Sequence, residues 1–194
     1  MLRPHAFLCS FLVVHIGFAS LVWEFKNQDK SPTSRVYHDM AGLDSFTSER
    51  LALLFGGLSG KGTLLNDTWI FNVSGDSTNQ WKRIYTNEGP LARRCHSMAT
   101  TTDSAFPGAV ILFGGLAHKS QQHQLTTTTT TLTQEHQYLK DLWLYHISKE
   151  IWTELNPTGY KGGPIPSARA YQRLAKFTPD GYNTSLILMF GGRL

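Results

Sequence analysis

The sequence predicts an all-β fold made of a repeated unit of short strands, and three observations point to it. Aromatic residues make up 12% of the 194 residues and glycine occurs 17 times, a mixture typical of many strands separated by turns. Apolar residues make up 41% and charged residues only 16%, which suits a packed core and excludes a wholly disordered chain. The third observation is a set of sequence elements that recurs along the chain.

The chain opens with an apolar segment typical of a targeting signal. Arg3 precedes the uncharged run 6–23, and the small residues around Ala19 fit cleavage after that position. We expect a signal peptide over 1–19, followed by a linker over 20–31. The alternatives are an uncleaved signal anchor over 6–23 and a buried apolar segment of a cytosolic chain. Both targeting interpretations place the rest of the chain in the secretory or extracellular compartment, either free or membrane-anchored.

Three Asn-x-Ser/Thr sequons agree with that compartment and mark possible N-glycosylation sites at Asn66, Asn72 and Asn183. Asn66 and Asn72 also fall where the fold itself favours polar residues. Cleavage of the leader would remove Cys9 and leave Cys95 as one thiol that forms no internal disulfide. We interpret Cys95 as a small buried residue.

The first recurring element is an apolar strand that ends in Phe-Gly-Gly. It ends at Gly57, and again 58 and then a further 77 residues along the chain. We expect the glycines to allow positive φ angles and close backbone approach. The structural glycines of the motif are Gly56, Gly57, Gly114, Gly115, Gly191 and Gly192.

A second element, Pro-x-x-Arg-x-x-His, precedes each of these strands. Its arginines are Arg35, Arg93 and Arg169, and they recur in register with the glycines. Gln172 replaces the histidine of the third copy. We expect each guanidinium to bind a neighbouring carboxylate or carbonyl oxygen in the loop before the first strand.

Two further elements follow the glycines in the first two copies. One is an Asp-x-Trp strand over 66–71 and 140–145, and the other is a strand that begins with Trp, over 81–84 and 152–155. One unit is therefore four short strands, and such units stack to cover their faces. We expect the tryptophans to pack between units: Trp69, Trp81, Trp143 and Trp152.

These four elements in this order resemble the kelch repeat, the blade unit of kelch β-propellers, over roughly residues 32–192. The resemblance implies a partial kelch propeller over 32–194, with about two and a half four-stranded blades after the N-terminal signal segment. The expected blades cover 32–88, 90–156 and, incompletely, 166–194. Because propellers have about 4 to 8 blades, we expect an open arc that can self-associate through its open blade faces.

The second copy contains a long insertion over 116–138, which we expect to be a polar loop. Six consecutive threonines occupy 126–131, and such a segment buries too little apolar area to offset its ordering entropy. Its histidines are His118, His123 and His136, and their spacing fits no standard metal site. We therefore predict no metal and no cofactor.

The function implied by the resemblance is a non-catalytic interaction scaffold that binds a protein or a glycan. Arg35, Arg93 and Arg169 are candidate binding residues, because the loops before the first strands lie near the ligand-facing end of such propellers. The 18 basic residues are scattered, which argues against nucleic acid, and no catalytic motif is present. The alternatives are a fragment of a kelch-core enzyme such as a copper radical oxidase, and a truncated product without independent function.

Overall fold

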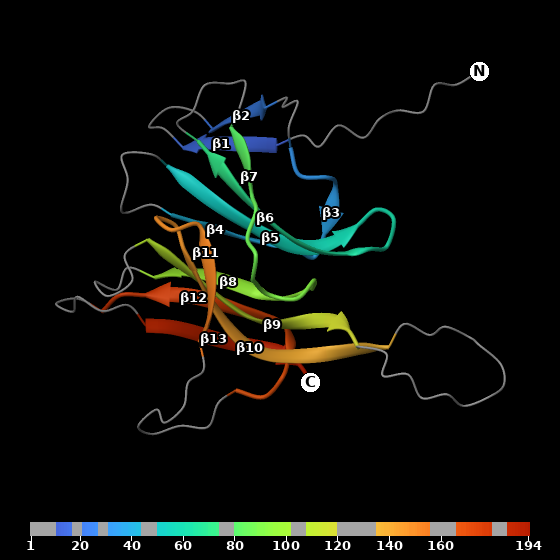
Figure 1. The fold of residues 1–194 in the computed structure, drawn as a ribbon. Coiled ribbons are helices and arrows are strands. Elements are labelled where there is room, and N and C mark those ends of the chain that lie inside the picture. The colour runs from blue at the N-terminus through green and yellow to red at the C-terminus, as the bar shows by residue number, and fades with distance from the viewer. Residues whose placement is uncertain are drawn as a thin grey trace, which may run out of the picture.

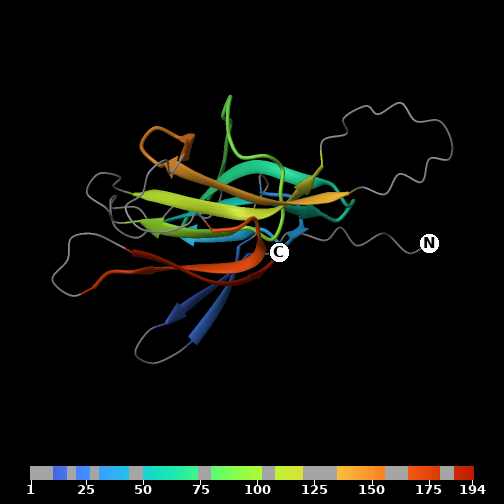
Figure 2. The ribbon, with the colours of Figure 1, turned by 90° about the horizontal axis from the view of Figure 1, so that it is seen from below.

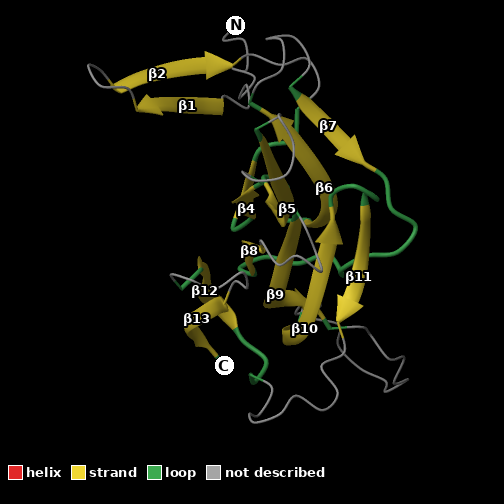
Figure 3. Cartoon of the chain, turned by 90° about the vertical axis from the view of Figure 1, so that its left-hand side faces the viewer, coloured by secondary structure: helices red, strands yellow, loops and turns green. Residues whose placement is uncertain are grey.

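The computed structural model describes residues 11–16, 21–26, 31–43, 50–73, 80–101, 108–119, 135–155, 166–179 and 186–194. Figure 3 shows strands and loops throughout these ranges and no helix. Consequently no described helix is long and apolar enough to cross a membrane. The strands are β1 (Phe11–Ile16), β2 (Leu21–Lys26), β3 (Arg35–Val36), β4 (Asp39–Gly42), β5 (Leu51–Ser59), β6 (Leu64–Asn72), β7 (Trp81–Ile84), β8 (Ser97–Thr101), β9 (Ala109–His118), β10 (His136–His146), β11 (Ile151–Leu155), β12 (Ala170–Phe177) and β13 (Leu186–Arg193).

The strands form antiparallel sheets that follow the repeats of the sequence (Figure 1). The repeat 1 sheet has the order β3-β5-β6-β7, with β4 also paired to β5. The repeat 2 sheet has the order β8-β9-β10-β11, and the repeat 3 pair is β12-β13. A five-stranded unit, a four-stranded unit and a two-stranded third confirm the predicted all-β, partial propeller fold, and the expected first strand of repeat 1 is divided into β3 and β4.

Strands β1 and β2 form a hairpin, in which Phe11 pairs with Lys26 and Ile16 pairs with Leu21. This hairpin covers part of the predicted signal segment and linker, and cleavage after Ala19 stays a prediction. The predicted glycosylation site Asn183 lies outside the described residues.

Both ends of the predicted loop 116–138 are strand, because β9 continues to His118 and β10 starts at His136. The extension has a packing reason: Leu116 and Tyr138 gather with Ala170 of repeat 3 in a small apolar cluster. The threonine run and His123 lie outside the described residues.

The main core lies between the repeat 1 and repeat 2 sheets. It joins residues from both, including Phe55 and Ile70 from repeat 1 and Leu112, Tyr145 and Trp152 from repeat 2. The Trp152 ring packs edge-on to Phe55 at 5.2 Å between centroids, and its Nε1 donates to Thr68 Oγ1 at 3.0 Å. Sheet-on-sheet burial of this kind fixes how one repeat stacks on the next.

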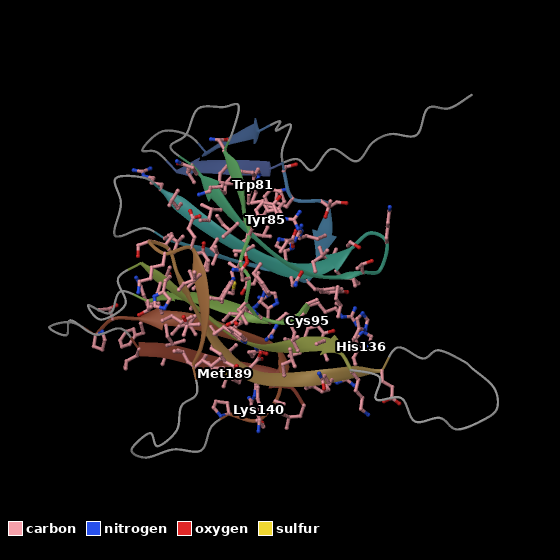
Figure 4. All side chains as sticks on the ribbon, in the orientation of Figure 1. Trp81, Tyr85, Cys95, His136, Lys140 and Met189 are labelled. Carbon is pink, nitrogen blue, oxygen red and sulfur yellow. The ribbon has the colours of Figure 1, made fainter. Side chains whose placement is uncertain are left out.

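The repeat 3 pair packs on the other side of repeat 2, through β12 against β8. Leu174 N donates to Ser97 Oγ at 3.0 Å across this contact. Figure 2 shows β12 and β13, in orange and red, beside the green strand β8 of repeat 2. Figure 4 shows Trp81 of repeat 1 near the top of the view and Met189 of β13 near the bottom, so the two lie far apart.

Candidate functional site: the arginine units and the contacts between repeats

Arg93 is fully buried, and all three nitrogens of its guanidinium donate hydrogen bonds within repeat 2. Its Nη1 and Nη2 donate to the two carboxylate oxygens of Asp141 at 2.7 and 2.6 Å. Nη1 also donates to the Gly114 carbonyl at 3.0 Å, and Nε donates to the Leu91 carbonyl at 2.9 Å. This bidentate pair links the loop before β8 to both the Gly-Gly strand and the Asp-x-Trp strand.

Arg35 makes the same contacts in repeat 1. Nη1 and Nη2 donate to the carboxylate oxygens of Asp67 at 2.5 and 2.8 Å, and Nη1 donates to the Gly56 carbonyl at 3.0 Å. Nε donates to the Thr33 carbonyl at 3.0 Å. The expectation that these arginines bind carboxylates and carbonyls therefore describes both complete repeats.

The tryptophan of each Asp-x-Trp strand completes the unit. Trp69 Nε1 donates to Asp67 at 2.7 Å, and Trp143 Nε1 donates to Asp141 at the same distance. Burial alone would raise the pKa of each aspartate, but the arginine and tryptophan hydrogen bonds lower both pKa values below the ordinary range. Both carboxylates are thus held ionised as internal partners for arginine.

Arg169 is oriented in the same way in repeat 3, but no described carboxylate pairs with it. Nη1 donates to the Gly191 carbonyl at 3.1 Å, and Nε donates to the Ser167 carbonyl at 3.2 Å. Nη2 donates to Ser167 Oγ at 2.8 Å, and these hydrogen bonds are exposed. The guanidinium is therefore fixed in orientation and accessible.

The same backbone hydrogen bonds join each repeat to the next. Gly57 N donates to Arg93 O at 2.8 Å, and Gly115 N donates to Arg169 O at 2.9 Å. Side chains at the preceding glycines would block this approach: a Cβ on Gly114, at φ +66°, would lie 2.6 Å from Arg169 O. A Cβ on Gly56, at φ +62°, would lie 2.8 Å from Arg93 O. The backbone role expected of these glycines has this geometric cause.

Three residues at equivalent positions form a short hydrogen-bonded column across the repeats. Cys95 N donates to Tyr37 O, and Tyr171 N donates to Cys95 O, both at 2.9 Å. All three have positive φ angles, between 58° and 65°. Tyr37 and Tyr171 are each 52% exposed, and the Arg94 guanidinium lies 5.7 Å from the centre of the Tyr37 ring. The positions just after the motif arginines thus expose an aromatic and cationic surface.

His96 and Gln172 occupy the histidine position of the motif and face the repeat before them. Gln172 Nε2 donates to the Phe113 carbonyl at 2.7 Å. The buried His96 ring packs edge-on to Phe55 at 5.5 Å, and neither of its nitrogens has a hydrogen-bond partner in the described part of the chain. Burial, followed by the charge of Arg93, lowers the pKa of His96 to about 3, so the imidazole is neutral.

The residues that directly follow the motif histidines, Asp39 and Ser97, also form hydrogen bonds between repeats. Asp39 accepts from Met98 N at 2.7 Å and from Ser97 Oγ at 3.2 Å. Ser97 in turn accepts from the backbone of repeat 3 at Leu174. Sequence reasoning missed these contacts and the aspartate partners of the arginines. The available signal for the arginine partners was the aspartate that recurs two residues before a tryptophan, at Asp67 and Asp141.

The four motif tryptophans lie on the same face of their repeats. Trp143 and Trp152 pack in the core between repeats 1 and 2. Trp69 and Trp81 lie on the equivalent face of repeat 1, with Phe71, and their rings meet edge-on at 6.4 Å. The predicted packing between repeats therefore describes the repeat 2 pair, which packs against repeat 1.

The remaining candidate residues fall in three settings. Asn66 is exposed on β6 and Asn72 is half-buried at its end. Cys95 is a buried free thiol, and burial raises its pKa. His118 and His136 face each other across β9 and β10, with ring centroids 5.2 Å apart. The described residues contain no cluster of three or more metal-ligating side chains.

Comparison with known proteins agrees with this geometry. A model of the KLHDC2/KLHL20/DRC7 Kelch-repeats domain matches residues 12–193. The solved structure titled "Structure of YjhT" is similar, with a TM-score of 0.56 at 15% identity over 93% of this chain. The chain spans 44% of the length of that structure's chain. No curated protein matches the chain. The recurring arginine units, the contacts between repeats and the match over almost the whole chain show that it belongs to the kelch-repeat domain family.

Proposed function

We propose that this chain is an interaction scaffold of the secretory or extracellular compartment, which binds a protein or glycan partner and catalyses no reaction. The observation that carries the proposal is the use of the motif charges inside the fold. Arg93 and Asp141 neutralise each other within repeat 2, as Arg35 and Asp67 do within repeat 1. Because these charged motif residues are paired inside the fold, partner recognition falls to the exposed residues of the loops.

The most suitable recognition surface is formed by Tyr37, Arg94 and Tyr171. All three lie one or two residues after a motif arginine: Tyr37 directly follows β3, Arg94 lies in the loop before β8, and Tyr171 is the second residue of β12. Tyrosine and arginine are enriched among the residues that dominate binding energy at protein interfaces. We therefore assign partner contact to these neighbours, and Arg35 and Arg93 support them from inside.

The binding proposal is tested by site-specific photo-crosslinking in secretion-competent cells. A crosslinker replacing Tyr37 or Tyr171 is expected to capture a partner that a crosslinker at Tyr85 does not. Tyr85 is the matched control, because it is 82% exposed on repeat 1 and lies beside Arg83. The purified partner should lose at least about tenfold in affinity on Tyr171→Ala and keep its affinity on Tyr85→Ala. Equal losses would contradict the assignment.

The compartment and the absence of catalysis need separate measurements. Expression of the full chain in glycosylating cells should give a glycosidase-sensitive mass shift that disappears in the combined Asn66→Gln, Asn72→Gln and Asn183→Gln variant. An unglycosylated cytosolic product would contradict the secretory assignment. Copper-dependent turnover of an alcohol by the purified chain would contradict the non-catalytic assignment.

A further inference from the structure

A pair of histidines lies at the end of the β9-β10 hairpin in repeat 2. His118 is the last residue of β9, His136 is the first residue of β10, and the two stand directly opposite each other in the register. Figure 4 shows His136 at the right-hand end of repeat 2. The two rings lie 5.2 Å apart between centroids, with an interplanar angle of 38°. The pair forms across two strands, so spacing along the sequence did not reveal it.

The backbone around this pair brings the two side chains close together. Lys119 N donates to Glu135 O at 2.9 Å, one residue beyond the pair on each strand. Hydrogen-bonded and non-hydrogen-bonded pairs alternate in an antiparallel ladder, so the two histidines occupy a non-hydrogen-bonded pair, in which opposite side chains approach most closely. Two residues further into the sheet, Leu116 and Tyr138 lie on the same face and pack in an apolar cluster. This cluster anchors the end of the hairpin.

The geometry of the pair fits a metal ion held between the two rings. With zinc–nitrogen bonds of about 2.0–2.1 Å and tetrahedral angles at the ion, the centres of two ligating imidazole rings lie about 5 Å apart. The observed separation of 5.2 Å agrees with this spacing. Nδ1 of His118 is also buried, and it has no hydrogen-bond partner in the described part of the chain. An unpaired buried ring nitrogen costs free energy, which coordination of a metal ion offsets.

The neighbouring charged side chains point away from the pair. Lys119 and Glu135 alternate to the opposite face of the strands, where Nζ lies 2.9 Å from the carboxylate. Their charges compensate each other, and the carboxylate is engaged away from the histidines. The ligands of the site are therefore imidazole nitrogens, which suit Zn²⁺, Cu²⁺ and Ni²⁺, whereas Mg²⁺ and Ca²⁺ prefer oxygen.

We propose that His118 and His136 form a two-histidine site for a divalent transition metal ion that favours imidazole, for which Zn²⁺ is the probe. The two rings supply two positions of a tetrahedral ion, and water supplies the others. Binding links the end of β9 to the start of β10 and holds the two strands together. An ion that binds the folded chain and not the unfolded chain also stabilises the fold by mass action. The inference does not depend on the scaffold function.

The test is a calorimetric titration of the full 194-residue chain with Zn²⁺ at neutral pH. We expect saturable binding whose affinity falls at least about tenfold in His118→Gln and in His136→Gln, since even the removal of a group that supports a metal ligand has this effect. His146→Gln is the matched control, because it makes the same substitution at the other end of β10, opposite Ala109 and Ile151. It should leave the affinity unchanged.

Hydrogen exchange gives a second readout, which a pair that only packs would not change. Zn²⁺ should slow exchange of the amides at 117–119 and 135–137 in the parent chain and should have no such effect in His118→Gln or His136→Gln. The proposal is overturned by a lack of saturable binding, by undiminished zinc binding in His118→Gln, or by equal affinity for Mg²⁺. A loss in Glu135→Gln as large as in His136→Gln would overturn it too, because the carboxylate would then be a ligand.

Discussion

Repeat 2 and repeat 3 share the same motif residues and differ in what surrounds them. The Phe-Gly-Gly strand is buried along almost its whole length in β9 and exposed along most of β13. Arg93 is buried in an ion pair with Asp141, whereas Arg169 donates to the Gly191 carbonyl and its guanidinium stays accessible. The motif therefore sets the position of the arginine and of the Phe-Gly-Gly strand, whereas the neighbouring strands determine how much each contributes to the free energy of unfolding.

The largest expected difference concerns the two arginines. Arg93→Ala leaves the partly buried Asp141 without its partner and should lower the free energy of unfolding by about 3–5 kcal/mol. Arg169→Ala removes exposed hydrogen bonds and should cost under about 1 kcal/mol. Urea unfolding of both variants measures the comparison. Similar costs at the two positions would show that repeat 3 is as enclosed as repeat 2.

A comparison of two glycines separates packing from backbone strain. Gly114 and Gly191 have φ angles of +66° and +72°, so alanine is strained at both positions. At Gly114 the new methyl also meets Arg169 O, and we expect a loss of about 3 kcal/mol against about 1 kcal/mol at Gly191. Thermal unfolding of Gly114→Ala and Gly191→Ala gives both values. A Gly191→Ala variant as unstable as Gly114→Ala would break the contrast.

A third prediction compares the histidine position of repeat 2 with the glutamine of repeat 3. The pKa of His96 is lowered to about 3, so between about pH 3 and 6.5 the unfolded chain binds a proton that the folded chain does not. Stability is therefore lost as pH falls below 6.5, by about 2 kcal/mol at pH 5. His96→Gln, which gives repeat 2 the residue that repeat 3 has at Gln172, should remove this loss.

Urea unfolding of the parent chain and His96→Gln at pH 7 and pH 5 checks the prediction. The buried aspartates contribute their own acid lability at lower pH, because their pKa values are lowered from already acidic values. They are present in both proteins and cancel in the difference. An unchanged pH dependence in His96→Gln would locate the acid-sensitive group elsewhere.

The smallest effect is expected at the surface contact between repeats 1 and 2. Lys82 Nζ lies 2.5 Å from Glu150 Oε1, but both side chains are well exposed to solvent. Lys82→Ala should change stability by no more than about 0.5 kcal/mol, and added salt should weaken even that difference. Urea unfolding at low and high salt tests it. A loss comparable with Arg93→Ala would give surface pairing a share in holding the repeats together.

The sequence was enough to predict the repeats, their strand content and the partners of the arginines by chemical class. Part of that information lies in the spacing, because the arginine reaches a glycine carbonyl 21 residues ahead in both complete repeats, and the aspartate accepts from the tryptophan two residues ahead. The identity of Asp67 and Asp141 as the partners, and the reach of Asp39 and Ser97 into the next repeat, needed coordinates. These contacts join residues far apart in sequence, and the arginine-to-aspartate separation changes from 32 to 48 residues between the repeats, so spacing alone did not pair them.

The sequence pointed to the three motif arginines as candidate binding residues, and that role stays a prediction. Arg35 begins β3, whereas Arg93 and Arg169 lie just before β8 and β12. Burial separates them, because the first two guanidinium groups bind carboxylates inside the fold and the third is accessible. Tyr37 and Tyr171 are exposed at positions with positive φ angles, and no sequence rule assigns such angles to tyrosine.

Amide hydrogen exchange along β9 and β13 tests the central claim most directly. It should be measured on the 194-residue chain at a concentration where sedimentation shows a monomer. We predict that amides of Leu186–Arg193 exchange on the order of a hundredfold faster than those of Ala109–His118, because β13 has one described neighbour and β9 has two. Equal protection of the two strands would contradict it.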